Sequence, residues 1–184
     1  MKRILVEGHQ GYYAKYPGNT MISFEAALKL GVDAIEFDVW LTADKVPVLM
    51  HDGNTYRICG VDRHLREMTL EEVKTLEPIN REVYGGRFVG QGITVPTLEE
   101  LLRLCAEKRP DLILGMEIKE YTEENVDITV ALLKKYGFLT IVISMPLTVG
   151  SSSISRPGTT AVPWDIRLFR CWSLRRIPLT ITMR

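Results

Sequence analysis

Short apolar runs alternate with amphipathic stretches over roughly the first three quarters of the 184-residue chain. The apolar runs are rich in β-branched residues and nearly continuous, which is typical of strands buried on both faces of a parallel sheet. The runs that we interpret as strands span residues 3–9, 33–41, 46–51, 111–119 and 138–144. Strands that alternate with helices predict an α/β fold with a parallel sheet.

Helix boundaries are marked by local capping signals. Asn19 or Thr20 is expected to begin a helix that Gly31 ends, because both side chains can accept a backbone N–H and glycine readily adopts the left-handed conformation. Two capping boxes, Thr69–Glu72 and Thr97–Glu100, predict the starts of a short helix and of a longer one.

Two connections depart from regular strand–helix alternation. The polar turn Thr42–Lys45 is too short for a helical crossover, so it joins either an antiparallel pair or two successive barrel strands. Residues 53–95 are polar, with isolated apolar positions, and we interpret them as a small insertion. Ligand chemistry gathers beyond the carboxyl ends of parallel strands, so the insertion is expected to cover an active-site face.

The C-terminal residues do not continue the pattern. After Thr140 the sequence contains one acidic residue, Asp165, and six arginines. We therefore expect residues 1–143 to form the ordered domain and 144–184 to be an irregular tail. Two explanations remain open: an irregular extension, or a sequence that does not continue the original design because of a shifted reading frame or truncation.

The composition excludes few functions but sets useful expectations. Lysines and arginines balance aspartates and glutamates at 23 each, so global charge does not favour binding to nucleic acid. No apolar run approaches the roughly 20 residues of a spanning helix, and the polar start does not resemble a signal peptide. Three cysteines without metal-ligand spacing are consistent with a reducing compartment, so a cytoplasmic location is expected.

Four of the predicted strands end in chemically reactive side chains. On a strand, residues two apart share a face, with Cα atoms about 6.6 Å apart. The candidates are His9 after the first run, Glu36 and Asp38 in the second, His51 after the third, and Glu117 and Lys119 in the fourth. Because these strand ends meet at one edge of the sheet, the side chains are expected to converge on one site.

Three converging carboxylates with one lysine would leave excess negative charge in a partly buried place. A hard divalent cation is the natural remedy, since carboxylate oxygens are its preferred ligands. Two histidines at the same rim can donate and accept protons near neutral pH. Glu7 and Asp52 adjoin these residues, but we expect them to point away, in salt-bridge or capping roles.

With these motifs the chain resembles the glycerophosphodiester phosphodiesterase family. The resemblance covers about residues 3–143 and runs in order through "GHQG", "YPGNT", "AALKLGVDAIEFDVWLTADKVPVLMHD", "VPTLEELL" and "MEIK". It implies a (β/α)₈ barrel of the TIM type with a small insertion after the strand that carries the second histidine. It also implies hydrolysis of glycerophosphodiesters to glycerol 3-phosphate and an alcohol, with one bound Ca²⁺ or Mg²⁺.

The resemblance also assigns roles to individual residues. Glu36, Asp38 and Glu117 would bind the cation, and Lys119 would neutralise phosphate charge. His9 and His51 would be the general acid and base. In the family's mechanism a glycerol hydroxyl attacks phosphorus with help from one histidine, while the other protonates the leaving alkoxide. Water then opens the cyclic phosphate.

Two departures from the family pattern lie beside these residues. Gln10 replaces the usual arginine of His-Arg-Gly; it can donate a hydrogen bond to phosphate but cannot form a charged bidentate contact. Gly18 replaces the glutamate that usually precedes Asn19. We assign a positioning role to Asn19. These departures predict altered specificity or lower activity.

Two alternative functions therefore remain open. One is a catalytically impaired or noncatalytic homologue that binds phosphodiesters. The other is an unrelated α/β-barrel lyase or isomerase that stabilises an enolate with its carboxylate-bound metal. The head-group alcohol and the oligomeric state are not determined by the sequence.

Overall fold

The structure is a computed structural model that describes residues 5–120, 122–138, 141–144 and 167–168. Its centre is a sheet in the order β1-β2-β4-β5-β6, with β3 paired to β2 outside this path. Every pairing is parallel except that of β2 with β3. The strands are β1 (Glu7–His9), β2 (Ala34–Leu41), β3 (Pro47–Leu49), β4 (Ile113–Ile118), β5 (Ile141–Ser144) and β6 (Arg167–Leu168). The expected α/β fold with a parallel sheet is confirmed.

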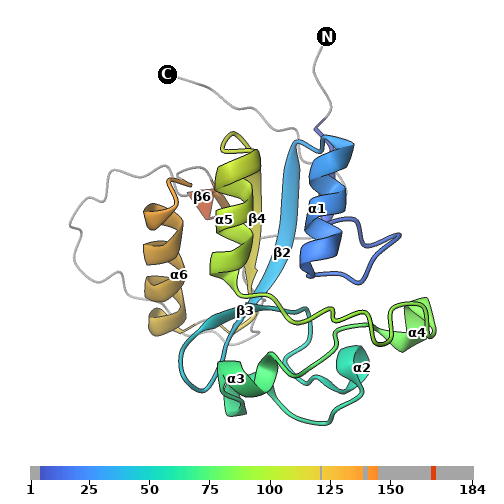
Figure 1. Ribbon diagram of the computed structural model, residues 1–184. Coiled ribbons are helices and arrows are strands. Elements are labelled where there is room, and N and C mark those ends of the chain that lie inside the picture. Colours follow the sequence, from blue (N-terminus) through green and yellow to red (C-terminus); the bar gives the residue numbers. More distant parts are fainter. Residues whose placement is uncertain (1–4, 121, 139–140, 145–166, 169–184) are drawn as a thin grey trace, which may run out of the picture.

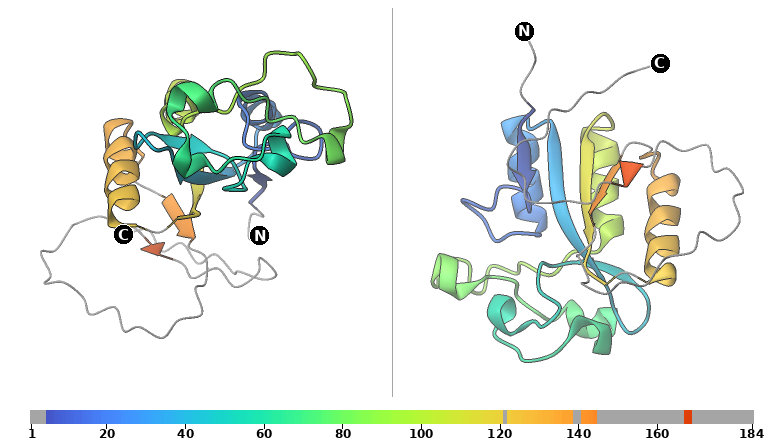
Figure 2. Two further views of the ribbon diagram at one scale, coloured as in Figure 1. Left: turned by 90° about the horizontal axis from the view of Figure 1, so that it is seen from below. Right: turned by 180° about the vertical axis from the view of Figure 1, so that it is seen from behind.

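Three longer helices cover one face of this sheet, as the opposite views in Figures 1 and 2 show. They are α1 (Met21–Leu30), α5 (Leu98–Lys108) and α6 (Glu123–Lys135). The main hydrophobic core lies between them and the sheet, with Ile35, Phe37 and Val39 of β2 fully buried against it. Because side chains alternate along a strand, the intervening Glu36 and Asp38 lie on the opposite face.

Local signals set the helix boundaries. Thr20, rather than Asn19, caps α1 by accepting a hydrogen bond from the Ser23 N–H, and Gly31 ends the helix with φ of 74°. In the predicted capping box of α5, Thr97 Oγ1 accepts from the Glu100 N–H while the Glu100 carboxylate accepts from the Thr97 N–H. Asn19 is thereby left available for a different contact.

The turn Thr42–Lys45 joins an antiparallel pair, which decides between the two arrangements that the sequence left open. Leu41 of β2 pairs with Pro47 of β3, and Lys45 adopts φ of 64° within the turn. The third strand is shorter than the predicted run 46–51, because it ends at Leu49. His51 therefore follows the strand by two residues.

Residues 53–95 contain only short elements, which lie beyond the carboxyl ends of the parallel strands (Figure 1). Their bounds are α2 (Tyr56–Cys59), η1 (Leu65–Glu67), α3 (Leu70–Val73) and α4 (Arg81–Tyr84). A second hydrophobic core, which includes Leu65, Met68 and Val73, holds this segment against Val48 of β3. The segment is thus a packed cap over one edge of the sheet.

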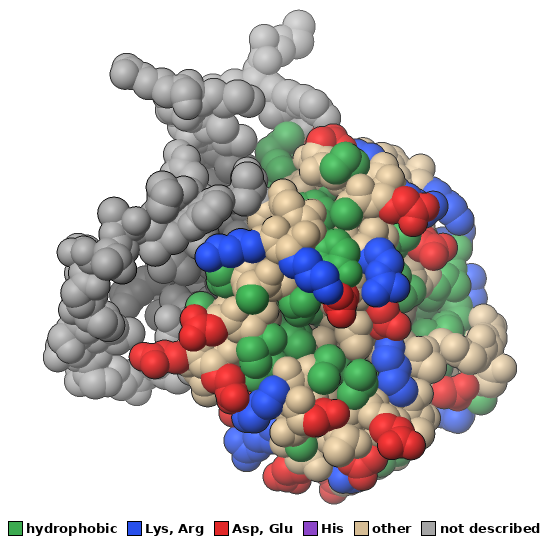
Figure 3. Space-filling view, turned by 60° about the vertical axis from the view of Figure 1, so that its left-hand side comes forward, with side chains coloured by type: hydrophobic (Ala, Val, Ile, Leu, Met, Phe, Trp, Pro, Cys, Tyr) green, Lys and Arg blue, Asp and Glu red, His purple; other side chains and the backbone are tan. Residues whose placement is uncertain are grey.

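Most of the predicted tail, residues 144–184, lies outside the described residues. Only Ser144, which ends β5, and Arg167 and Leu168, which form β6, are described. Among the described helices, none combines the length and apolar character that crossing a bilayer requires. On the face shown in Figure 3, acidic and basic side chains are intermixed.

Candidate active site

The three predicted acidic ligands meet on neighbouring strands. β2 and β4 are paired in parallel so that Asp38 stands beside Glu117, and Glu36 lies two residues earlier on β2. One carboxylate oxygen from each residue lies within 4.8 Å of those of the other two. Sheet register, set by residues 34–39, thus brings together side chains that are about 80 positions apart.

Asp38 is the most enclosed of the three, with no exposed surface. Its Oδ2 accepts hydrogen bonds from Gln10 Nε2 at 3.0 Å and from Asn19 Nδ2 at 2.7 Å. The Asp38 N–H in turn donates to Asn19 Oδ1 at 3.2 Å. Two residues of the loop after β1 therefore orient one face of this carboxylate.

The other oxygen, Asp38 Oδ1, has no hydrogen-bond donor among the described residues. Lys119 Nζ lies 2.9 Å away as an ion-pair partner. Lys119 also lies 2.9 Å from Glu117 Oε1. Burial opposes a charged ammonium, yet the ion pairs with Asp38 and Glu117 outweigh it and raise the pKa of Lys119.

The raised pKa of Glu36 shows that the positive charge of Lys119 does not balance the negative charge of the three carboxylates. Burial, and next the charge of Asp38, raise the pKa of Glu36 to about 8. A buried carboxylate group in this position is stabilised by additional positive charge. The ion-paired Asp38 oxygen and the crowded carboxylates, whose negative charge Lys119 alone does not balance, therefore fit a hard divalent cation, for which oxygen ligands are preferred.

His9 lies beside this cluster at the end of β1. Its Nε2 is 3.8 Å from Glu36 Oε2, and 62% of its side chain is exposed. The same Glu36 oxygen accepts a hydrogen bond from the Gln10 N–H at 3.0 Å. His9 is thus close to the acids but accessible to a substrate.

His51 is held by residues that follow β3. Its Nδ1 lies 2.7 Å from Asp52 Oδ1, and Arg57 Nε donates to Asp52 Oδ2 at 2.6 Å. The hydrogen bond from Arg57 lowers the pKa of Asp52. Trp40 Nε1 fixes the backbone by donating to the His51 carbonyl at 3.3 Å. With Nδ1 occupied, Nε2 is the nitrogen left for proton transfer.

Two expectations about neighbouring acids are corrected by this geometry. Asp52 does form a salt bridge, with Arg57, but it does not point away from the site, because it contacts His51 directly. Glu7 lies two residues before His9 on β1 and therefore shares its face. Its charge raises the pKa of Glu36, and its carboxylate approaches Gly115 on the same side of the sheet.

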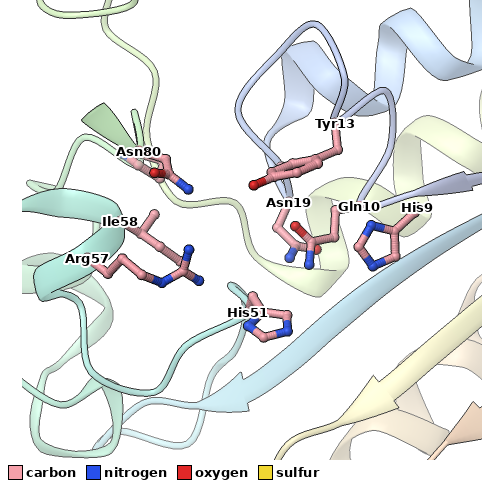
Figure 4. A pocket seen from close by; sticks show the side chains of 10 residues that line it. His9, Gln10, Tyr13, Asn19, His51, Arg57, Ile58 and Asn80 are labelled. Carbon is pink, nitrogen blue, oxygen red and sulfur yellow. The ribbon is translucent and has the colours of Figure 1, made fainter. Parts of the chain in front are cut away.

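The two histidines line a cavity of about 180 Å³ between the sheet edge and the 53–95 segment. Figure 4 shows His9, at the end of β1, and His51, in the segment after β3, approaching the cavity, with Gln10 and Asn19 between them. The acids are not among its lining residues, and Gln10 and Asn19 connect the cavity to Asp38.

Three polar residues that line the cavity were not predicted as site residues from the sequence: Tyr13, Arg57 and Asn80. Tyr13 comes from the loop after β1, and the other two come from the 53–95 segment. Nothing in local periodicity or capping distinguishes them from ordinary loop residues. Only the fold of the segment over the strand ends brings them to the cavity.

Gln10 and Gly18, the two residues that depart from the family pattern, lie against each other. Gln10 is 6% exposed and adopts φ of 51°. A Cβ at Gly18 would lie 2.4 Å from Gln10 Oε1 and 2.8 Å from Tyr13 Cδ2. The present position of the Gln10 side chain therefore requires glycine at residue 18.

Comparisons with known proteins identify the family. Residues 9–137 match the glycerophosphoryl diester phosphodiesterase family. A glycerophosphodiester phosphodiesterase of Caldanaerobacter subterraneus is 37% identical over 117 residues, which cover 64% of this chain and 46% of that protein. One from Bacillus altitudinis is 35% identical over 60% of this chain and 43% of that protein. The chain thus spans about half the length of these curated relatives.

Solved structures show the same likeness. An Oleispira antarctica phosphodiesterase, in complex with the product sn-glycerol-3-phosphate, is 28% identical with a TM-score of 0.67, over 77% of this chain and 57% of that one. A glycerophosphodiester phosphodiesterase from Agrobacterium tumefaciens is 25% identical with the same TM-score, over 78% and 58%. These neighbours have the TIM-barrel fold, as expected. With strand order, site and family match in agreement, the chain belongs to the glycerophosphoryl diester phosphodiesterase family.

Proposed function

We propose that this protein hydrolyses glycerophosphodiesters to glycerol 3-phosphate and an alcohol. The observation that carries the proposal is the pair of accessible histidines beside a three-carboxylate cluster and a lysine. General acid–base chemistry needs two such groups on opposite sides of the phosphorus. A lyase or isomerase acting through an enolate would not account for the family match.

We assign proton transfer to the two histidines. One accepts the proton of the attacking glycerol hydroxyl while the other gives a proton to the leaving alkoxide. The roles reverse when water opens the cyclic phosphate. His51 is better fixed for this task, because its Nδ1 is held by Asp52, which accepts a hydrogen bond from Arg57. His9 is held more loosely, 3.8 Å from Glu36.

The charged residues stabilise the phosphate. Glu36, Asp38 and Glu117 would bind one divalent cation, Ca²⁺ or Mg²⁺, which supplies positive charge to the pentavalent phosphorane oxygens when bound. Lys119 adds a fixed positive charge at the same cluster. Gln10 would donate at most a neutral hydrogen bond to phosphate, and its Nε2 already donates to Asp38.

The catalytically impaired homologue remains the second candidate, because Gln10 is neutral and engaged. An assay of glycerol 3-phosphate release from glycerophosphocholine and glycerophosphoglycerol, with added Ca²⁺ or Mg²⁺ and with EDTA, decides between them. Release that EDTA abolishes supports the hydrolase. Binding of these diesters without release under any of these conditions supports the noncatalytic homologue.

The same assay tests the site residues. His9→Ala and His51→Ala are each expected to lower turnover at least about 100-fold, the usual contribution of a general acid or base. Turnover equal to that of the unsubstituted protein in either variant would remove that histidine from the mechanism.

We further propose that residues 1–143 are a barrel segment with residues 53–95 as its insertion, that 144–184 are an irregular tail, and that the protein is cytoplasmic. The packing of residues 53–95 against β3 supports their assignment as an insertion within residues 1–143. Limited proteolysis followed by mass spectrometry tests it, since early cuts within residues 98–135 would contradict it. Cell fractionation tests the location.

A further inference from the structure

Asn80 has an unusual environment for a polar side chain. It is 5% exposed, and its Oδ1 has no hydrogen-bond partner within the part of the chain that the structure describes. Its backbone is well fixed, because the Asn80 N–H donates to the Ile58 carbonyl at 2.9 Å and the residue adopts φ of 42°. Buried amides normally form hydrogen bonds, so an unpaired one that lines a cavity indicates a missing partner.

Arg57 approaches the same cavity with unused donors. Its Nε donates to Asp52, while no hydrogen bond within the described ranges involves Nη1 or Nη2. Asp52 raises the pKa of Arg57, with smaller contributions from Tyr13 and Glu82. The guanidinium is therefore charged but largely balanced by neighbouring acids. Its free N–H groups, more than its net charge, are what it offers to a ligand.

The third group is Tyr13, whose ring packs edge-on against Tyr84 at 6.0 Å between centroids. Figure 4 shows the Tyr13 hydroxyl, the Arg57 guanidinium and the Asn80 amide converging on the cavity from two different segments. His51 lies at the edge of this group. These polar groups and the two histidines line one cavity.

We propose that Tyr13, Arg57 and Asn80 form a subsite for hydroxyl groups of the alcohol esterified to the phosphate. Diesters of polyols such as glycerol or inositol are then preferred over diesters of choline. The inference rests on the proposed function and specifies its substrate class.

The selectivity has a simple physical origin. A hydroxyl group can donate its proton to the unpaired Asn80 Oδ1, and its oxygen can accept from the free Arg57 N–H groups. A trimethylammonium group can neither accept nor donate one, so it would desolvate these groups and leave them unpaired. A site built to bind a hydroxyl rejects analogues that lack it for this reason.

The test compares glycerophosphoglycerol, glycerophosphoinositol and glycerophosphocholine as substrates of the full chain and of Asn80→Asp. Aspartate has the same size as asparagine and tolerates the left-handed conformation, but its carboxylate would pair with the Arg57 guanidinium and occupy the groups that the hydroxyl would bind. We expect the unsubstituted protein to favour the polyol diesters about tenfold in kcat/KM, and the variant to lose that preference.

Gln91→Glu is the matched control. It makes the same amide-to-acid change in the 53–95 segment, at an exposed residue outside the cavity. The control is expected to keep the tenfold preference. An equal kcat/KM for all three diesters in the unsubstituted protein would overturn the subsite while leaving the hydrolase intact.

A binding measurement separates failure of the subsite from failure of the proposed function. Titration calorimetry with the intact diesters, in a His9→Ala background that blocks turnover, measures affinity directly. Tighter polyol binding that Asn80→Asp removes supports the subsite, even if the unsubstituted protein hydrolyses nothing. If Asn80→Asp lowers the affinity equally for all three diesters, Asn80 contacts the glycerol moiety that the three share. That result would overturn the proposed selectivity.

Discussion

At the scale of single residues, the contacts of the site depend on a few tightly fitted positions. Gln10 reaches Asp38 only because Gly18 leaves room for its side chain. Gln10 and Gly18 both depart from the family pattern, and the side chain of Gln10 fits only because residue 18 is glycine. Considered separately, each substitution looks like the loss of a functional group.

Gly18→Ala is expected to lower the free energy of unfolding by about 1–3 kcal/mol, the usual cost of overpacking a close-packed position. Urea denaturation measures it. Gly86→Ala is the control, because Gly86 is exposed and a Cβ there would meet nothing within 4 Å. Equal stability of the two variants would show that Gln10 has another position available.

Asp52 is the second residue whose role can be tested alone. Asp52→Asn removes the negative charge beside His51, and an amide whose oxygen accepts from Arg57 Nε would present an N–H to His51 Nδ1. We therefore expect kcat to fall at least about tenfold with a smaller change in KM. The ¹⁵N chemical shifts of the imidazole should also move, because the preferred tautomer is lost. With three histidines in the chain, the signals can be assigned by substitution.

Asp62→Asn is a matched control, since it makes the same change at an exposed aspartate of the 53–95 segment that pairs with Asn54. Unchanged nitrogen shifts for His51 in Asp52→Asn would contradict the positioning role, whatever happens to activity.

Asp52 also predicts a dependence of stability on pH. The Arg57 hydrogen bond lowers the pKa of Asp52 in the folded state, so its contribution is present above the unfolded value of 3.8 and is lost below it. The contribution is at most about 1 kcal/mol, because the pair is partly exposed. The stability difference between the unsubstituted protein and Asp52→Asn should therefore shrink below about pH 4. Denaturation curves at pH 7 and pH 3 measure it, and a constant difference would exclude the pair as its source.

At the scale of elements, the start of α5 helps to hold the 53–95 segment over the site. Glu100, which belongs to the capping box of α5, also forms an ion pair with Lys74 of that segment, with 2.6 Å between Lys74 Nζ and the Glu100 carboxylate. Thr97 also forms an isolated bridge with Val48 of the third strand. The start of α5 thus joins the 53–95 segment to the sheet.

Thr97→Ala is expected to cost about 1 kcal/mol of unfolding free energy, the usual value of an N-cap. Thr69→Ala removes the same type of capping box from the four-residue helix α3, in which only Val73 is buried. Chemical denaturation should therefore show a smaller loss for Thr69→Ala. A larger loss there would mean that α3 carries more of the fold than its burial indicates.

At the scale of the whole molecule, the acid cluster links two strands and the loop after β1. A ligand that binds only the folded state stabilises it by mass action, by about 2.7 kcal/mol at a hundredfold excess over Kd. We therefore expect Ca²⁺ or Mg²⁺ to raise the thermal midpoint of EDTA-treated protein, and Glu36→Gln to remove this effect. Differential scanning calorimetry measures both.

Glu107→Gln is the control for this experiment, since Glu107 is an exposed acid at the end of α5. It should leave the cation-dependent shift unchanged. A shift of the same size in Glu36→Gln and in the unsubstituted protein would show that the cation stabilises the fold elsewhere.

Much of the fold could be predicted because its signals are local. The cap and the stop of α1, the capping box of α5 and the alternation around Glu36 and Asp38 each depend on residues within a few positions. The family resemblance added which residues meet across the sheet, and Glu36, Asp38 and Glu117 do converge.

What only the tertiary structure decided is the set of contacts between distant segments. Asn19 was an equal candidate for capping α1, yet it binds Asp38 on another strand. Asp52 was expected to point away, but the chain turns after β3 and directs it to His51. Asn80 reaches the cavity because residues 53–95 pack over the strand ends. Local propensity and periodicity act over one or two turns of chain, whereas these contacts depend on sheet register and packing, which no short stretch of sequence contains.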